Sequence, residues 1–142
     1  LVMLNHQGYL CLYRRARRDG RLLLLPPERI FLDPGGRFLY LAAGRAGRSG
    51  RRKIDLVDWD GDGDLDLLTD GDAPIWYENT GSRQKPVMRL RGPLLKTSLG
   101  GHNATPIGVD WDGDGRMDLL VGAQDGFFYY FERSYIDAMA AR

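Results

Sequence analysis

The residues best placed to do chemistry are two sets of aspartates, in which most neighbouring aspartates are two positions apart. Five carboxylates lie between residues 58 and 66 (loop one), and a segment with similar spacing lies between residues 110 and 118 (loop two). Carboxylates this close repel one another strongly unless a cation neutralises them. Calcium takes six to eight oxygen ligands, which carboxylates at alternate positions of a tight loop supply. The spacing therefore predicts two Ca²⁺ sites.

In each loop the predicted ligands are four aspartate side chains and one main-chain carbonyl. Glycines at the fourth and sixth positions allow the sharp backbone path that wraps the ion. The seventh residue supplies its carbonyl, which explains why it is an aspartate in one loop and an arginine in the other. The predicted ligand residues are Asp58, Asp60, Asp62, Asp64 and Asp66 in loop one, and Asp110, Asp112, Asp114, Arg116 and Asp118 in loop two.

Three other interpretations of these loops can be weighed. An EF-hand needs a bidentate Glu at position twelve and flanking helices. Position twelve is Thr69 in one loop and Val121 in the other, and the flanks are strand-like, so the EF-hand is excluded. Magnesium is an alternative, although it prefers fewer protein ligands and more water. The remaining alternative is a pair of solvated acidic turns without metal, which the near-identity of the two loops disfavours.

The loops belong to an internal repeat. Residues 58–68 recur as residues 110–120 with nine of eleven positions identical, and residues 76–79 match residues 130–133. A partial third copy opens the chain, where the residues resemble the stretch that follows loop two. The chain thus begins in mid-repeat, which favours a piece of something longer or a unit completed by another chain.

Each repeat has the pattern of short β-strands. Runs of apolar and aromatic residues are bounded by Gly, Asp, Asn and Pro, and turn signals recur about every ten residues. A period near 50 residues with about four strands per unit favours β-propeller blades. The strands are predicted near residues 1–4, 9–14, 21–25, 38–42, 54–58, 65–69, 75–78, 87–90, 107–110, 117–121 and 127–132, and a short helix near 135–141.

The predicted fold is therefore all-β, a partial propeller of about two and a half four-stranded blades with calcium loops between the first and second strands of blades. Its units are a blade end (1–53), two calcium blades (54–106 and 107–133) and a tail (134–142). A ring needs four to eight blades, so other blades must complete it. Trp59 and Trp111 hold the same repeat position and are predicted to wedge between adjacent blades.

This pattern resembles FG-GAP and VCBS-type repeats, the calcium-loop blades of integrin α-subunit propellers and of many secreted bacterial proteins. The resemblance covers residues 1–133 and is carried by residues 57–68 with 75–79, and by residues 108–122 with 126–132. It departs in the first unit, which lacks an aspartate loop and is longer. The resemblance implies an extracellular calcium-binding module whose ligands meet the ring face opposite the calcium loops.

On that opposite face the resemblance places loops rich in charged and amide residues. The predicted ligand-binding residues are Arg51, His102 and Asn103, which suit a polyhydroxylated or anionic sugar. The alternative is an ordinary polar rim that binds no ligand. The wider set also contains Arg48, Arg52, Asp70, Asp72, Gln124 and His6. A non-catalytic glycan- or protein-binding role is favoured because no G-x-S-x-G motif, Cys–His pair or zinc signature occurs. The alternative is part of a secreted carbohydrate-active enzyme such as a polysaccharide lyase.

The composition constrains partners and location. The chain has 142 residues and a net charge of +1, so its overall field favours no particular partner. Two arginine-rich runs lack interleaved aromatics, which argues against nucleic acid. No apolar run approaches the ~18 residues of a membrane span, and any export signal lies outside this segment. Cys11 is the single cysteine and is predicted to be a small buried hydrophobe.

Overall fold

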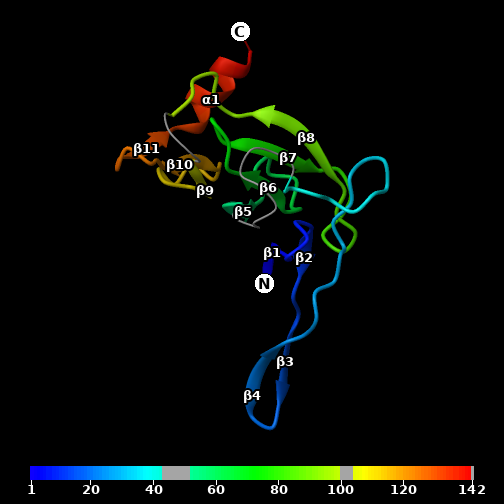
Figure 1. Cartoon of the computed structure of the whole chain (residues 1–142). Coiled ribbons are helices and arrows are strands. Elements are labelled where there is room, and N and C mark those ends of the chain that lie inside the picture. Colours follow the sequence, from blue (N-terminus) through cyan, green and yellow to red (C-terminus); the bar gives the residue numbers. More distant parts are fainter. Residues whose placement is uncertain (43–51, 100–103, 142) are drawn as a thin grey trace.

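The computed structural model describes residues 1–42, 52–99 and 104–141, and in this part the chain is all-β with one short helix. Its centre is a four-stranded antiparallel sheet in the order β5-β6-β7-β8 (Figure 1). These strands are β5 (Ile54–Val57), β6 (Asp66–Thr69), β7 (Ile75–Asn79) and β8 (Met88–Pro93). A second antiparallel sheet has the order β11-β10-β9. It contains β9 (Thr105–Val109), β10 (Asp118–Gly122) and β11 (Phe128–Phe131), and α1 (Arg133–Ala140) follows.

The strands of the two sheets confirm the repeat. Loop one joins β5 to β6, and loop two joins β9 to β10, so each aspartate loop lies between the first and second strands of its sheet, as predicted. The second sheet has three strands in the described residues. In the first copy β7 is followed by β8, whereas in the second copy β11 is followed by α1. The predicted helix is present and begins at Arg133, two residues before the expected start. The number of blades stays a prediction.

The N-terminal region differs most from the sequence expectation. Here β1 (Val2–Leu4) pairs with β2 (Leu10–Leu12), and β3 (Arg15–Arg18) pairs with β4 (Arg21–Leu24). The β3–β4 hairpin projects away from the rest of the molecule (Figure 1) and turns at Asp19 and Gly20, which both have positive φ. Its first strand was not among those expected, because four residues rich in arginine carry no apolar alternation.

The strand expected near residues 38–42 is not a regular strand. Phe38 and Tyr40 form isolated bridges, with Leu32 and Tyr9 respectively. The alternation of apolar residues in this segment has another cause. Leu39 and Leu41 are buried against the central sheet, while Phe38 and Tyr40 are largely exposed. Burial of one side therefore produced a strand-like pattern without a continuous ladder.

The central sheet is covered on both faces. Leu67 and Leu68 are adjacent in β6 and both are fully buried, but they belong to different apolar clusters because successive strand residues point to opposite faces. Leu67 packs with N-terminal residues such as Leu10 and Phe31. Leu68 packs with the second sheet and α1, for example with Leu119 and Ile136. The sheet thus lies between two neighbours, as a propeller blade would.

Cys11 confirms its predicted role as a small buried residue. It is 0% exposed, and its thiol donates to the Tyr9 carbonyl at 3.5 Å. Burial raises the pKa of this thiol, which keeps it protonated and weakly nucleophilic.

The two sheets approach closely at Gly108. A Cβ atom there would lie 2.7 Å from Cγ1 of Val57, so a larger residue does not fit without displacement. The Gly108 amide also donates to Oδ2 of Asp55 at 2.8 Å. A glycine at this position therefore permits both the close packing and the hydrogen bond between β5 and β9.

We expect Gly108→Ala to lower the free energy of unfolding by about 1–3 kcal/mol, because the added methyl group overpacks the contact with Val57. Gly122→Ala is the matched control, since its Cβ would meet Phe128 at an ordinary 3.4 Å. We expect the control to change stability by less than about 1 kcal/mol. Urea denaturation of both variants measures this, and equal losses would contradict the tight contact.

Candidate metal-binding loops

The first aspartate of each loop organises the backbone that follows it. One Asp58 oxygen accepts from the Gly61 amide at 3.0 Å, and the other accepts from the Gly63 amide at 3.0 Å. Asp110 repeats both bonds at 2.8 and 3.1 Å with the equivalent glycines of loop two. Gly61 and Gly63 have φ of 79° and 92°, which L side chains rarely adopt. The glycines are therefore required by the path of the loop.

The next two aspartates continue the same pattern. Oδ1 of Asp60 accepts from the amide of Asp62, and Oδ1 of Asp62 accepts from the amide of Asp64 at 2.8 Å. In loop two the amide of Arg116 donates to Asp114 at 2.7 Å. The seventh residue thus joins the loop through its main chain. This explains why Asp64 and Arg116 are interchangeable there, and it is compatible with a carbonyl ligand.

The first three aspartates of each loop bring their carboxylates together. Oxygens of Asp58, Asp60 and Asp62 lie within 4.8 Å of one another, and the equivalent residues of loop two form a second such group. Burial raises the pKa of Asp60, and the charges of Asp62, Glu78 and Asp58 raise it further. Each group has the composition of a site for a hard cation, because its donors are all carboxylate oxygens.

The ninth residue of each loop behaves differently from the first three. Asp66 and Asp118 are each 1% exposed and are not members of the two groups of mutually close carboxylates in the described residues. Asp66 accepts from the Asn79 amide at 2.7 Å and from Nε1 of Trp76 at 3.0 Å. These bonds fasten the end of loop one to β7. Ligation of a metal by Asp66 and Asp118 stays a prediction.

Asp118 shares the position of Asp66 but has a different hydrogen-bond set. It accepts from the Arg133 amide at 2.8 Å, the Tyr130 hydroxyl at 2.9 Å and the Trp111 amide at 3.2 Å. Burial raises the pKa of Asp66 to about 6 despite its hydrogen bonds. Burial acts on Asp118 too, but its hydrogen bonds outweigh it and hold the pKa below the ordinary value.

The sequence interpretation missed the partners of the two buried aspartates. Trp76 and Tyr130 occupy equivalent repeat positions, and each donates to the aspartate at the ninth position of its own loop. Asn79 and Arg133 are also equivalent, and each donates its main-chain amide. The match between residues 76–79 and residues 130–133 was the available signal, because a donor repeated downstream of a repeated aspartate indicates that the two copies share a pairing.

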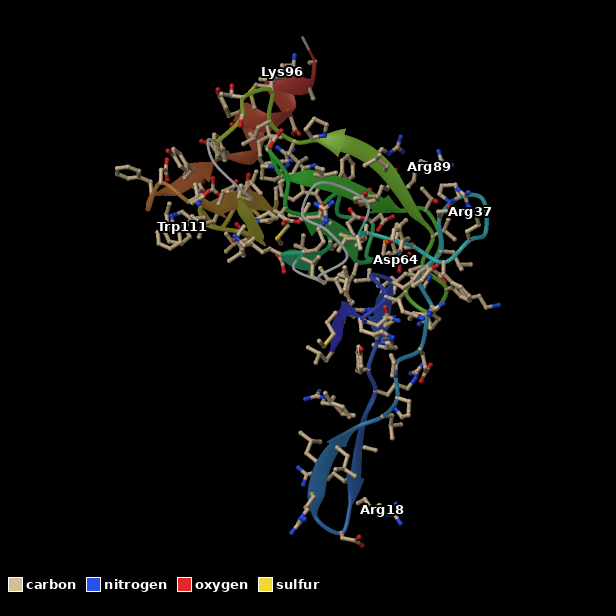
Figure 2. The ribbon with its side chains drawn as sticks, in the orientation of Figure 1. Arg18, Arg37, Asp64, Arg89, Lys96 and Trp111 are labelled. Atoms are coloured by element: carbon tan, nitrogen blue, oxygen red, sulfur yellow. The ribbon has the colours of Figure 1, made fainter. Side chains whose placement is uncertain are left out.

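The two loop tryptophans have opposite environments. Trp59 is 2% exposed and packs between the central sheet and the second sheet with α1, which confirms its predicted wedging role. Trp111 is 65% exposed and lies at the outer side of the second sheet (Figure 2). Within the described residues the wedging role is confirmed for Trp59 alone, because a neighbouring unit buries Trp59 while Trp111 stays largely exposed beside Tyr130. For Trp111, wedging against a further blade stays a prediction.

The candidate ligand residues of the opposite rim are only partly within the described residues. Arg51, His102, Asn103 and Arg48 lie outside them. Arg52 is engaged in holding the fold, since Nε donates to the Leu41 carbonyl at 2.8 Å and Nη1 pairs with Asp70 at 3.2 Å. Asp70 is 1% exposed. These contacts of Arg52 join the N-terminal region to the end of β6. A ligand-binding role for Arg52 or Asp70 stays a prediction.

The remaining rim candidates lie in separate places. Gln124 lines a hollow of about 490 Å³ together with Lys53 and Phe128. His6 is exposed in the turn between β1 and β2, and Asp72 is exposed in the turn between β6 and β7. A sugar-binding role for any of them stays a prediction.

Comparison with known proteins gives one match. Residues 58–121 match the family model of the FG-GAP-like repeat. The matched segment runs from the first aspartate of loop one into β10, so it contains both loops and supports the resemblance to FG-GAP repeats. No curated protein and no solved structure has a significant match to the chain. Among the described residues there is no helix with the length and apolar character to span a membrane.

Replacement of the two tryptophans tests their different environments. We expect Trp59→Ala to lower the free energy of unfolding by about 3–5 kcal/mol, because it leaves a cavity between the sheets. In the isolated monomeric chain Trp111→Ala, the control at the equivalent repeat position, should change it by less than about 1 kcal/mol. Denaturant unfolding followed by circular dichroism measures both. A large loss for Trp111→Ala would mean that another molecule covers this face in solution.

Proposed function

We propose that this chain is a calcium-binding module of an extracellular β-propeller, with a non-catalytic binding or structural role toward a glycan or protein. The observation that carries the proposal is the repetition of one carboxylate pattern, with the same main-chain hydrogen bonds, at equivalent places in two adjacent sheets. A site that recurs at the same structural position in two sheets suits a structural role, in which the ion stabilises the strand pair, better than it suits an active centre. The FG-GAP-like match at residues 58–121 supports the same class of module.

The choice of calcium rests on the donors. Each loop offers several carboxylates and main-chain carbonyls on a flexible glycine-containing backbone, which suits the six to eight oxygen ligands of Ca²⁺. Magnesium requires a near-ideal octahedron and usually keeps several waters. Extracellular modules bind calcium with dissociation constants of about 10⁻⁴–10⁻³ M, which fits a site formed by exposed loop tips. We propose that the two sites bind calcium in that range, which suits the calcium concentration outside the cell, and we therefore propose an exported protein.

The bound ions would stabilise the strand pairs on which the loops sit. Each loop joins the first two strands of a sheet, so a cation that draws its carboxylates together also holds these strands in register. A ligand that binds the native state alone stabilises it by about 2.7 kcal/mol when its concentration is 100 times the dissociation constant.

Completion of the ring is part of the proposal. The face of the central sheet that meets the second sheet contains Trp59, Leu68 and Trp76. The equivalent residues of the second sheet include Trp111 and Tyr130, which are 65% and 42% exposed. Because the repeat buries this face in its first copy, we expect further blades, from a longer chain or from other copies, to cover it in the second.

We expect calorimetric titration to find two calcium ions per chain and chelation to lower the melting temperature. Asp58→Asn should abolish one site and Asp110→Asn the other, because each removes a carboxylate from one group of three. Asp64→Asn is the matched control, since it removes the same charge from loop one but leaves the main-chain contact to Asp62. Absence of binding heat, with equal melting temperatures in chelator and in calcium, would refute the calcium proposal.

The alternative function is a subregion of a secreted polysaccharide lyase, in which Arg51 or His102 acts with calcium. A glycan array combined with a lyase assay on acidic polysaccharides, with and without chelator, separates the two functions. We expect binding without turnover. Turnover that disappears in His102→Ala or Arg51→Ala, while the variants still unfold cooperatively, would favour the enzyme.

A further inference from the structure

Arg133, the first residue of α1, contacts both aspartate loops. Its backbone follows β11 in the second sheet, whereas its side chain reaches Trp59 in loop one. The side chain is 14% exposed and therefore lies mostly within the protein. A hollow of about 110 Å³ separates the loops, and its wall includes Asp58 and Asp60 from loop one, Arg116 from loop two, and Arg133. The loops are therefore neighbours with this arginine between them.

The guanidinium group fixes the backbone of loop one. Nη1 of Arg133 donates to the main-chain carbonyl of Trp59, the residue between Asp58 and Asp60. The guanidinium carbon also lies 4.6 Å from the centroid of the Trp59 ring, within the range of a cation–π contact. Together these contacts set the orientation of the peptide that joins two of the three clustered carboxylates. Arg133 is in this sense a positioning residue for loop one.

The same residue is fastened to loop two by two routes. Its amide donates to Oδ1 of Asp118 at 2.8 Å. Its Nε donates to Oδ1 of Asp137 at 2.9 Å, and the other oxygen of Asp137 accepts from the guanidinium of Arg116. Asp118 and Arg116 are the ninth and seventh residues of loop two. Any ordering of loop two therefore restricts the backbone of Arg133 and the carboxylate that orients its side chain.

We propose that Arg133 couples the two loops, so that a cation bound in one loop raises the affinity of the other. This inference rests on the proposed cation binding and adds a relation between the two sites. The physical basis is entropic: the first cation orders the contacts of Arg133, and the second cation then binds to a loop whose backbone is already restricted. By linkage the effect is the same in both directions. Repulsion between the two ions acts in the opposite sense, so the sign of the coupling is a real test.

The coupling can be measured with calcium alone as the probe. Loop one alone is measured in a variant with Asp110→Asn and Asp114→Asn, and loop two alone in a variant with Asp58→Asn and Asp62→Asn. The coupling factor is the product of the two association constants in the unmodified chain, divided by the product of the two constants measured separately. We expect a factor of at least about 5, at the lower end of typical allosteric coupling.

Arg133→Met should bring the coupling factor close to one. This substitution removes the guanidinium contacts to loop one but keeps the amide that donates to Asp118. Asp137→Asn, which weakens the hold on the guanidinium from α1, should lower the factor partway and serves as a second variant if Arg133→Met folds poorly. Arg14→Met is the matched control, because it removes an arginine whose partner, Glu28, lies outside both loops.

The possible results separate this inference from the calcium proposal. A coupling factor above one that falls in Arg133→Met and persists in Arg14→Met supports both. Two functional sites with a factor of one or less overturn the coupling and leave calcium binding intact. A factor above one that Arg133→Met does not change overturns the role of Arg133. Absence of calcium binding to every protein overturns the coupling together with the proposed function.

Discussion

The burial of both faces of the central sheet is the constraint on which the rest of the structure depends. A sheet with one apolar face can rest on a single neighbour, but Leu67 and Leu68 point in opposite directions and are both fully buried. The N-terminal region and the second sheet are therefore both needed to keep water from β6. Stability is distributed over two interfaces, and a repeat unit of this kind contributes little without its neighbours.

The aspartate loops are built on the rigidity that this packing provides. Asp66 and Asp118 start the two central strands and are buried, so the end of each loop is anchored in the packed part of its sheet. Their hydrogen bonds fasten loop one to β7 and loop two to Tyr130 of β11 and Arg133 of α1. The glycine-containing tips are left exposed and carry the clustered carboxylates. Packing of the strands thus sets the position of each loop, and hydrogen bonds within the loop set the arrangement of its carboxylates.

Local information predicted most of the fold and the core of the site. The repeat located both loops and the strands beside them, because spacing and turn residues depend on nearby sequence. What it did not predict depends on distant contacts or on neighbours. Trp59 and Trp111 have the same local sequence but differ in exposure because one has a covering unit. The contact of Arg133 with Trp59 joins residues 74 positions apart in the sequence. The segment around Phe38 has strand-like alternation but forms isolated bridges instead of a regular strand.

The long separation between Trp59 and Arg133 has a consequence for biosynthesis. At ordinary rates of translation, Trp59 is made roughly 4–15 s before the residue that binds its carbonyl, since the two are 74 positions apart in the sequence. During that interval the indole lacks the strands and helix that will bury it. Any chaperone demand of this core would therefore arise at the centre of the chain, before its last strand is translated.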